Sequence, residues 1–253
     1  LATPRQERKH GTDEHVEVVG VLEQVLAEGL HAVVAHFLPV DPLVRHFSYD
    51  SYWRTFRRHK ALVLATPGYS SLSWHTRTIL YCLEHKLTSV SDGLTRELMH
   101  FPGHMTEVIE LFRELYRSFG IEYTNPVRDW DVPPDRQFID QVIVNTHGGD
   151  FLLGEDNLLL RTTGRYLHEL GIMPAPNVKG SKLDRLMQQD CYPFAIYNIL
   201  AFWCYLSREP YPAFCQRVRA LFAEKCAHAR SLIEEHRLRP SDSRIARLFG
   251  AES

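Results

Sequence analysis

The apolar residues of this chain recur at helical spacing along nearly its whole length, which constrains the fold more than any single motif does. No segment alternates apolar and polar residues as a half-buried strand would. Prolines and glycines such as Pro67-Gly68 and Pro102-Gly103 separate the periodic segments, and these residues end or kink helices. The pattern predicts helices near residues 15–38, 43–64, 70–87, 90–100, 104–119, 135–153, 156–170, 181–206, 211–237 and 241–248.

The domain organisation follows from this helical pattern. The irregular stretch 120–135 could separate two halves, but each half alone would be small for a core. A chain of 253 residues with 44% hydrophobic content can bury a substantial core as one unit. We therefore expect an all-α fold, a single multi-helix bundle spanning 1–253, in which 1–14 is a flexible tail.

The charge of the chain gives no sign of a nucleic-acid or membrane partner. Its formal net charge is −2, and basic residues are scattered. The one longer basic cluster shares a helix with Trp53 and Phe56 and reads as a solvated face or as a contact for a substrate carboxylate. It comprises Arg54, Arg57, Arg58, His59 and Lys60. No apolar run is long enough to span a bilayer, and the polar first residues lack a signal-peptide core, so a cytoplasmic protein is expected.

Several catalytic motifs are missing from the sequence, which narrows the chemistry. There is no G-x-S-x-G, no phosphate-binding P-loop, no G-x-G-x-x-G after a strand and no H-E-x-x-H. The five cysteines contain no C-x-x-C pair, so they are expected to be reduced thiols rather than zinc ligands or a disulfide framework. Once these classes are set aside, the chemistry that fits the sequence is that of a metal or a haem bound inside a helical bundle.

Two pairs of possible metal ligands flank the break at Pro102-Gly103. Glu97 and His100 are spaced i, i+3 before it, and His104 and Glu107 are spaced i, i+3 after it. Side chains at this spacing lie on one face of a helix and can project together. The alternative is that these residues cap and solvate the helix ends.

A second candidate pair, Glu224 and His228, is spaced i, i+4 near the C-terminus. His228 falls in the middle of the apolar stripe, so it is either a ligand or a core imidazole hydrogen-bonded to Glu224 or a carbonyl. The positive charge of Lys225 on the same face counts against a metal. Glu155 belongs to a third and weaker pair, with His147. His46 is expected to be an ordinary histidine at the core edge.

Two further histidines are candidates for roles outside a metal cluster. His75, beside Trp74 and next to an apolar stripe, is expected to be a catalytic, distal or gating residue. His168 is the best lone candidate for the proximal ligand of a haem.

The segments Ile109–Ile121 and Asp41–Phe47 resemble the haem-oxygenase-like fold, and in particular its iron-containing redox branch. The resemblance implies a non-haem iron site, which in that family holds two irons and in which carboxylates and imidazoles leave positions open for O₂. The ligands it implies are Glu97, Glu107, Glu155, Glu224 and His228, with His100 and His104 competing for a nitrogen position. The closing His, Asp and His of that branch are not reproduced in this chain.

This resemblance implies an iron-dependent oxygenase or oxidase acting on an amino-acid or fatty-acid-like small molecule, in specialised metabolism, with O₂ as co-substrate. Substrate contacts are expected from Arg57, Arg77, Trp74, Tyr81 and Trp203. One alternative is a haem b enzyme of the tryptophan-dioxygenase-like helical class, with His75 or His59 distal and His168 proximal. Another is a non-catalytic helical binding protein. A homodimer also remains open.

Overall fold

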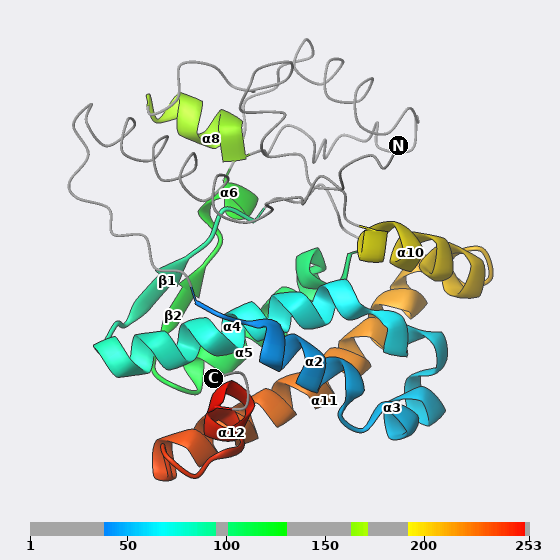
Figure 1. Cartoon of the computed structure of the whole chain (residues 1–253). Helices are drawn as coiled ribbons and strands as arrows, with labels where there is room; N and C mark the ends of the chain where they lie inside the picture. Colours follow the sequence, from blue (N-terminus) through cyan, green and yellow to red (C-terminus); the bar gives the residue numbers. More distant parts are fainter. Residues whose placement is uncertain (1–37, 95–100, 131–162, 172–191, 251–253) are drawn as a thin grey trace, which may run out of the picture. The chain divides into compact units, whose positions relative to one another are not determined.

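The computed structural model describes residues 38–94, 101–130, 163–171 and 192–250. The chain divides between Pro39 and Val40 into two units, and every element named below belongs to the second unit, Val40–Ser253. Helices dominate the described residues, as Figure 1 shows, which confirms the all-α class at this coarse level. The helices predicted at 15–38 and 135–153 and the tail at 1–14 lie outside the described residues.

The first described elements are four helical segments. They are α2 (Asp41–Tyr49), α3 (Tyr52–His59), the 3₁₀ helix η1 (Lys60–Leu64) and α4 (Thr66–His85). The single helix predicted over 43–64 is wrong, because the backbone turns into the left-handed region at Ser51 (φ 60°) and has a positive φ again at Lys60 (φ 54°). Neither residue is a glycine or proline, so the usual sequence signals for a helix end are missing there.

Two short strands interrupt the helical pattern. Strand β1 (Ser89–Ser91) pairs in parallel with β2 (Glu122–Thr124), with Val90 opposite Tyr123. The expectation that the chain has no strand is therefore wrong, and the predicted helix 90–100 does not begin at residue 90. Three residues are too few for an alternating pattern to stand out in a sequence. Between the strands lie the 3₁₀ helix η2 (Pro102–His104) and α5 (Thr106–Arg117), and α6 (Pro126–Asp129) follows β2.

The C-terminal part of the described chain contains the longest helix. Its elements are α8 (Thr163–Glu169), α10 (Tyr192–Ala201), the π-helix η5 (Phe202–Leu206), α11 (Tyr211–Leu238) and α12 (Arg244–Gly250). Helix α11 agrees within one residue with the segment predicted at 211–237. Pro212 in its first turn and the turn around Pro240 explain why the sequence marks both ends well.

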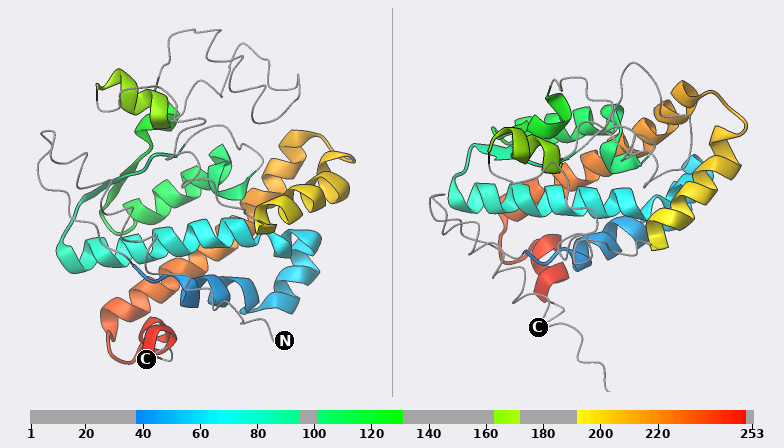
Figure 2. Two further views of the ribbon diagram at one scale, coloured as in Figure 1. Left: turned by 45° about the horizontal axis from the view of Figure 1, so that its top comes forward. Right: turned by 90° about the horizontal axis from the view of Figure 1, so that it is seen from above.

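The core lies among α4, α5 and α11, which are seen in two further views in Figure 2. Helices α5 and α11 form the most extensive contact between described elements. The predicted apolar stripe of α5 is buried, with Val108, Phe112 and Leu115 at most 1% exposed. At Gly68 the chain needs a residue without a side chain, because a Cβ there would lie 2.4 Å from the Cζ atom of Phe222. No described helix combines the length and apolar character needed to cross a bilayer.

Candidate metal centre

Three side chains from two helices meet where the end of α2 packs against the middle of α11. His46 lies in the last turn of α2, and Asp50 is the residue that caps the C-terminal end of this helix, four positions later. His228 comes from α11. One ligand atom from each residue lies within 4.8 Å of the others, and this is the one group of three or more potential ligands found among the described residues.

The two imidazoles face each other through their Nε2 atoms. These atoms are 2.8 Å apart, and the rings are stacked with centroids 5.1 Å apart. The Oδ2 atom of Asp50 lies 3.8 Å from Nε2 of His228. Ligands bound at about 2.1 Å in a tetrahedral or octahedral site are separated by about 3 to 3.4 Å. The separations of 2.8 Å and 3.8 Å lie within about half an ångström of this range, and the Asp50 carboxylate would also have to approach His46 for one transition metal ion to contact all three side chains.

Both imidazoles are suited to bind a metal at neutral pH. Partial burial lowers the pKa of His46 and of His228, and the nearby Asp50 carboxylate only partly opposes this effect. A lowered pKa keeps the rings neutral. One Nε2 atom donates the 2.8 Å hydrogen bond to the other, so a metal ion held by both would require the donor ring to carry its proton on Nδ1. The Asp50 side chain is 45% exposed, so the ligands are accessible from solvent.

Lys225 anchors the turn that carries the first two ligands. Its ammonium group donates a hydrogen bond of 2.6 Å to the carbonyl of Phe47 and lies 5.0 Å from the centre of the Tyr69 ring. Burial lowers the pKa of this lysine. The bond fixes the last turn of α2 against α11, although the positive charge of Lys225 opposes the binding of a cation nearby.

Glu224 is not part of this group, although it precedes His228 by one turn. Its Oε1 atom lies 2.8 Å from the Arg58 guanidinium and 3.1 Å from Nε2 of His59. Burial opposes ionisation of the carboxyl group, but these hydrogen bonds keep the pKa of Glu224 below its usual value. The structure thus separates the predicted pair and directs Glu224 toward α3.

The residues around the predicted turn at Pro102-Gly103 do not join His228 either. The His104 ring packs against Phe101. Burial raises the pKa of the Cys215 thiol, and the charge of Glu107, across the contact between α5 and α11, raises it further. Glu97 and Glu155, also predicted as ligands, lie outside the described residues, so their metal roles stay predictions.

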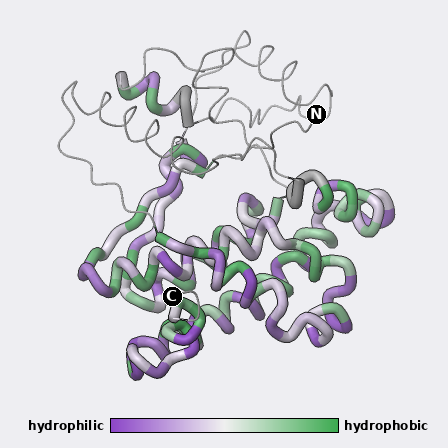
Figure 3. Tube along the Cα trace, viewed as in Figure 1, coloured by the Kyte–Doolittle hydropathy of each residue, from purple (hydrophilic) through white to green (hydrophobic). Residues whose placement is uncertain are grey.

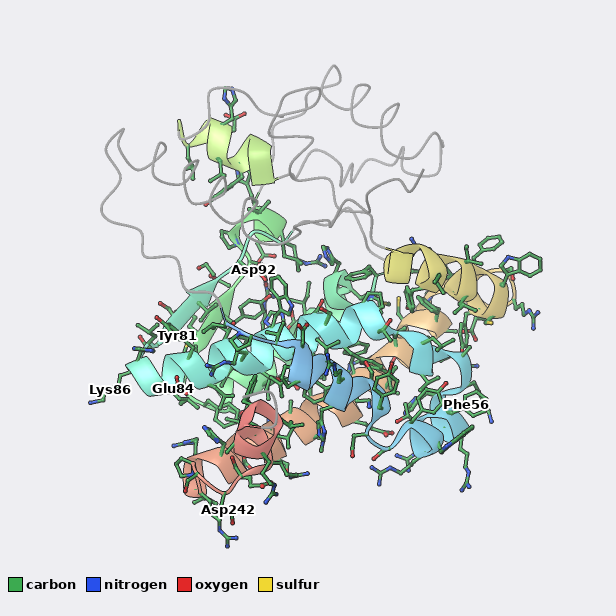
Figure 4. All side chains as sticks on the ribbon, viewed as in Figure 1. Phe56, Tyr81, Glu84, Lys86, Asp92 and Asp242 are labelled. Atoms are coloured by element: carbon green, nitrogen blue, oxygen red, sulfur yellow. The ribbon has the colours of Figure 1, made fainter. Side chains whose placement is uncertain are left out.

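His75 is enclosed by aromatic rings rather than placed beside the metal candidates. Its ring centre is 4.3 Å from that of Phe112, and its Nδ1 atom is 3.2 Å from the Tyr116 hydroxyl. Burial lowers the pKa of His75 to about 4, against an opposing effect of Asp92. Tyr123 also packs on this imidazole and donates a short hydrogen bond to Asp92, which is labelled in Figure 4. The contact of Tyr123 with His75 connects strand β2 to α4.

The residues predicted to contact a substrate are spread over several elements. Trp74 on α4 and Trp203 on η5 are 62% and 66% exposed. Tyr81, labelled in Figure 4, packs against His85, with the two rings tilted by 38°. Arg77 lies 3.7 Å from Glu84.

Two other predicted residues lie elsewhere. Arg57 lines a shallow groove on α3. His168 is partly buried on α8 and accepts a backbone hydrogen bond from Gly171 through its carbonyl. Its proposed role as a haem ligand stays a prediction.

Sequence reasoning identified His228 but missed His46 and Asp50. Their i, i+4 spacing was a usable signal, since a histidine and a carboxylate at that spacing share one helical face. His46 nevertheless resembles any histidine at the edge of a core. Only the packing of α2 on α11 distinguishes it.

No family model, curated protein or solved structure shows significant similarity to this chain. The chemistry of the site must therefore be argued from its own residues.

Proposed function

We propose that this protein is an iron-dependent oxidoreductase that uses O₂ and binds Fe(II) through His46, Asp50 and His228. The observation that carries the proposal is the convergence of two imidazole nitrogens and one carboxylate oxygen within 4.8 Å. Two histidines and one carboxylate, with the remaining positions open, form a ligand set suited to non-haem Fe(II) in oxygenases. This set shares only His228 with the ligands that the sequence resemblance implies.

Bound iron would supply the one-electron and O₂ chemistry that amino-acid side chains lack. The chain's own residues supply the rest. His46 and His228 provide neutral nitrogen ligands, and the Asp50 carboxylate offsets part of the metal charge. Lys225 holds the end of α2 in place, and its charge favours an anionic group as a further ligand. A small carboxylate substrate of the amino-acid or fatty-acid class fits that preference.

Anaerobic titration with Fe(II), and with Co(II) as a coloured probe, tests the metal site. We expect one ion per chain, with absorption bands of bound Co(II). The variants His46→Ala, Asp50→Asn and His228→Ala should each weaken binding about 100-fold or more, because each removes a ligand. Unfolding curves of the variants distinguish loss of a ligand from loss of the fold.

Glu224→Gln and His104→Ala are the matched controls, because both positions were ligand candidates and lie outside the three-residue group. They should bind Co(II) as the unmodified protein does. Equal binding by all five variants would contradict the assignment. Consumption of O₂ by the Fe(II)-loaded protein tests the oxidoreductase activity, and His228→Ala should abolish it. A site that binds zinc but never iron would contradict the oxidoreductase activity and leave the metal site itself in place.

An absorption spectrum of the protein as purified separates this proposal from the haem alternative. A Soret band that disappears in His168→Ala would show that the cofactor is haem b and not non-haem iron. If neither metal nor haem is found and Fe(II) does not change the melting temperature, the remaining alternative is the non-catalytic helical binding protein.

A further inference from the structure

Helix α3 exposes aromatic rings and arginines on the same two turns. Trp53 is 73% exposed and Phe56 is 42% exposed. The Trp53 ring packs edge-on against those of Tyr52 and Phe56, with centroids 5.6 and 6.3 Å apart. Figure 4 labels Phe56 on this helix. A contiguous exposed aromatic cluster of this kind usually marks an interaction surface.

The arginines of α3 line a groove beside this cluster. The groove has a volume of about 620 Å³ and is lined by Trp53, Arg54, Arg57 and Arg58. Arg58 is paired with Glu224, and Arg54 donates to the Ser51 hydroxyl. Among the described residues, none forms an ion pair or hydrogen bond with Arg57. Helix α3 contains no acidic residue, so the groove is suited to an anion.

A second exposed apolar face lies close to the end of α3. On α10 and η5 it consists of Ile196, Ile199, Phe202 and Trp203, each at least 58% exposed. The Tyr205 hydroxyl donates to the carbonyl of His59, 3.2 Å away, and so connects η5 to the last residue of α3. Figures 1 and 2 show α3 and α10 at the same end of the described helices, and Figure 3 shows apolar stretches along α10.

We propose that this end of the protein binds the surface of a membrane containing anionic phospholipids. The groove of α3 receives a lipid phosphate, while Trp53, Phe56, Phe202 and Trp203 enter the boundary between headgroups and acyl chains. Tryptophan rings are enriched at that boundary, and arginines attract anionic lipids.

The combination of exposed rings and arginines at one end of the protein favours an anionic bilayer. A fluid bilayer accepts projecting rings without a matching shape. The overall charge of −2 does not prevent this contact, because salt screens charges beyond about 10 Å and the local arginines then dominate. The binding is peripheral, and it does not require a bound metal ion.

Flotation of the full chain with lipid vesicles tests the proposal. The protein should float with vesicles of phosphatidylcholine and phosphatidylserine at 0.1 M salt, and should not float with phosphatidylcholine alone. Arg57→Glu, and separately Trp53→Ala with Phe56→Ala, should each reduce the floating fraction at least about fivefold. Raising the salt to about 0.5 M should release the protein.

Arg237→Glu and Leu238→Ala provide matched controls at the far end of α11. They lie about 40 Å along that helix from its first residue, and Leu238 is 83% exposed. Both should float as the unmodified protein does. Equal flotation with neutral vesicles, no flotation at all, or an equal loss in the controls would overturn the proposal. So would saturable binding of inorganic phosphate without vesicle binding, which would assign the groove to a soluble anion.

Discussion

At the scale of single residues, the surroundings of a side chain decide what it can do. His228 was placed on an apolar helical face by its spacing, and it is half-buried there, next to His46 and Phe47. Helical periodicity does not say which residue stands opposite, and it favoured Glu224 as the partner because of its i, i+4 position. The structure pairs His228 with His46 and pairs Glu224 with Arg58.

Gly68→Ala tests the tight packing of single residues in the core. An added Cβ would lie 2.4 Å from the Phe222 ring and 2.7 Å from the Cβ of Pro102. We expect a loss of about 1 to 3 kcal/mol in the free energy of unfolding, measured by urea denaturation, because a dense core resists extra volume. Gly250→Ala, where a Cβ would meet nothing within 4 Å, should cause no such loss. Equal stability of the two variants would count against this packing.

At the scale of elements, the contact between α2 and α11 creates the metal candidate. Ser51 follows the end of α2 in the left-handed conformation, so that α3 runs in a new direction. Asp50, just before this turn, then stands beside His46 and His228. The sequence pattern predicted α2 and α3 as one continuous helix, so the junction between them could not be inferred from that pattern.

Lys225→Met tests what holds the junction together. Methionine keeps much of the apolar stem but leaves the Phe47 carbonyl without its donor. We expect the free energy of unfolding to fall by about 1 to 3 kcal/mol, because a buried carbonyl loses its hydrogen bond. Arg219→Met, at an exposed position on the same helix, is the control. If the two variants melt alike, the ammonium group does not hold α2 in place.

At the scale of the whole molecule, stability should depend on pH through buried neutral histidines. The pKa of His75 is lowered to about 4 in the folded protein, from its usual 6.5. Between these values the unfolded chain binds more protons than the folded one. The contribution of His75 is therefore complete above about pH 6.5 and is lost as the pH falls toward 4.

We expect this loss to be on the order of 3 kcal/mol, since each pKa unit corresponds to about 1.4 kcal/mol. Urea denaturation from pH 7 to pH 4 measures it. His75→Asn should flatten the profile, because it removes the buried imidazole. His46 and His228 add slopes of the same sign, because their pKa values are also lowered. A slope that persists fully in His75→Asn would show that other groups cause it.

The sequence alone determined the helical character of the described chain, the limits of α11 and the buried stripe of α5. These are local properties, because proline punctuation and helical periodicity act within a few turns. The sequence pattern did not predict the strands β1 and β2, because each has only three residues and forms its ladder hydrogen bonds with the other strand. Only the tertiary structure decided that His46 and Asp50 meet His228, which lies 182 residues after His46. Contacts at that separation depend on how helices pack, and no local pattern encodes them.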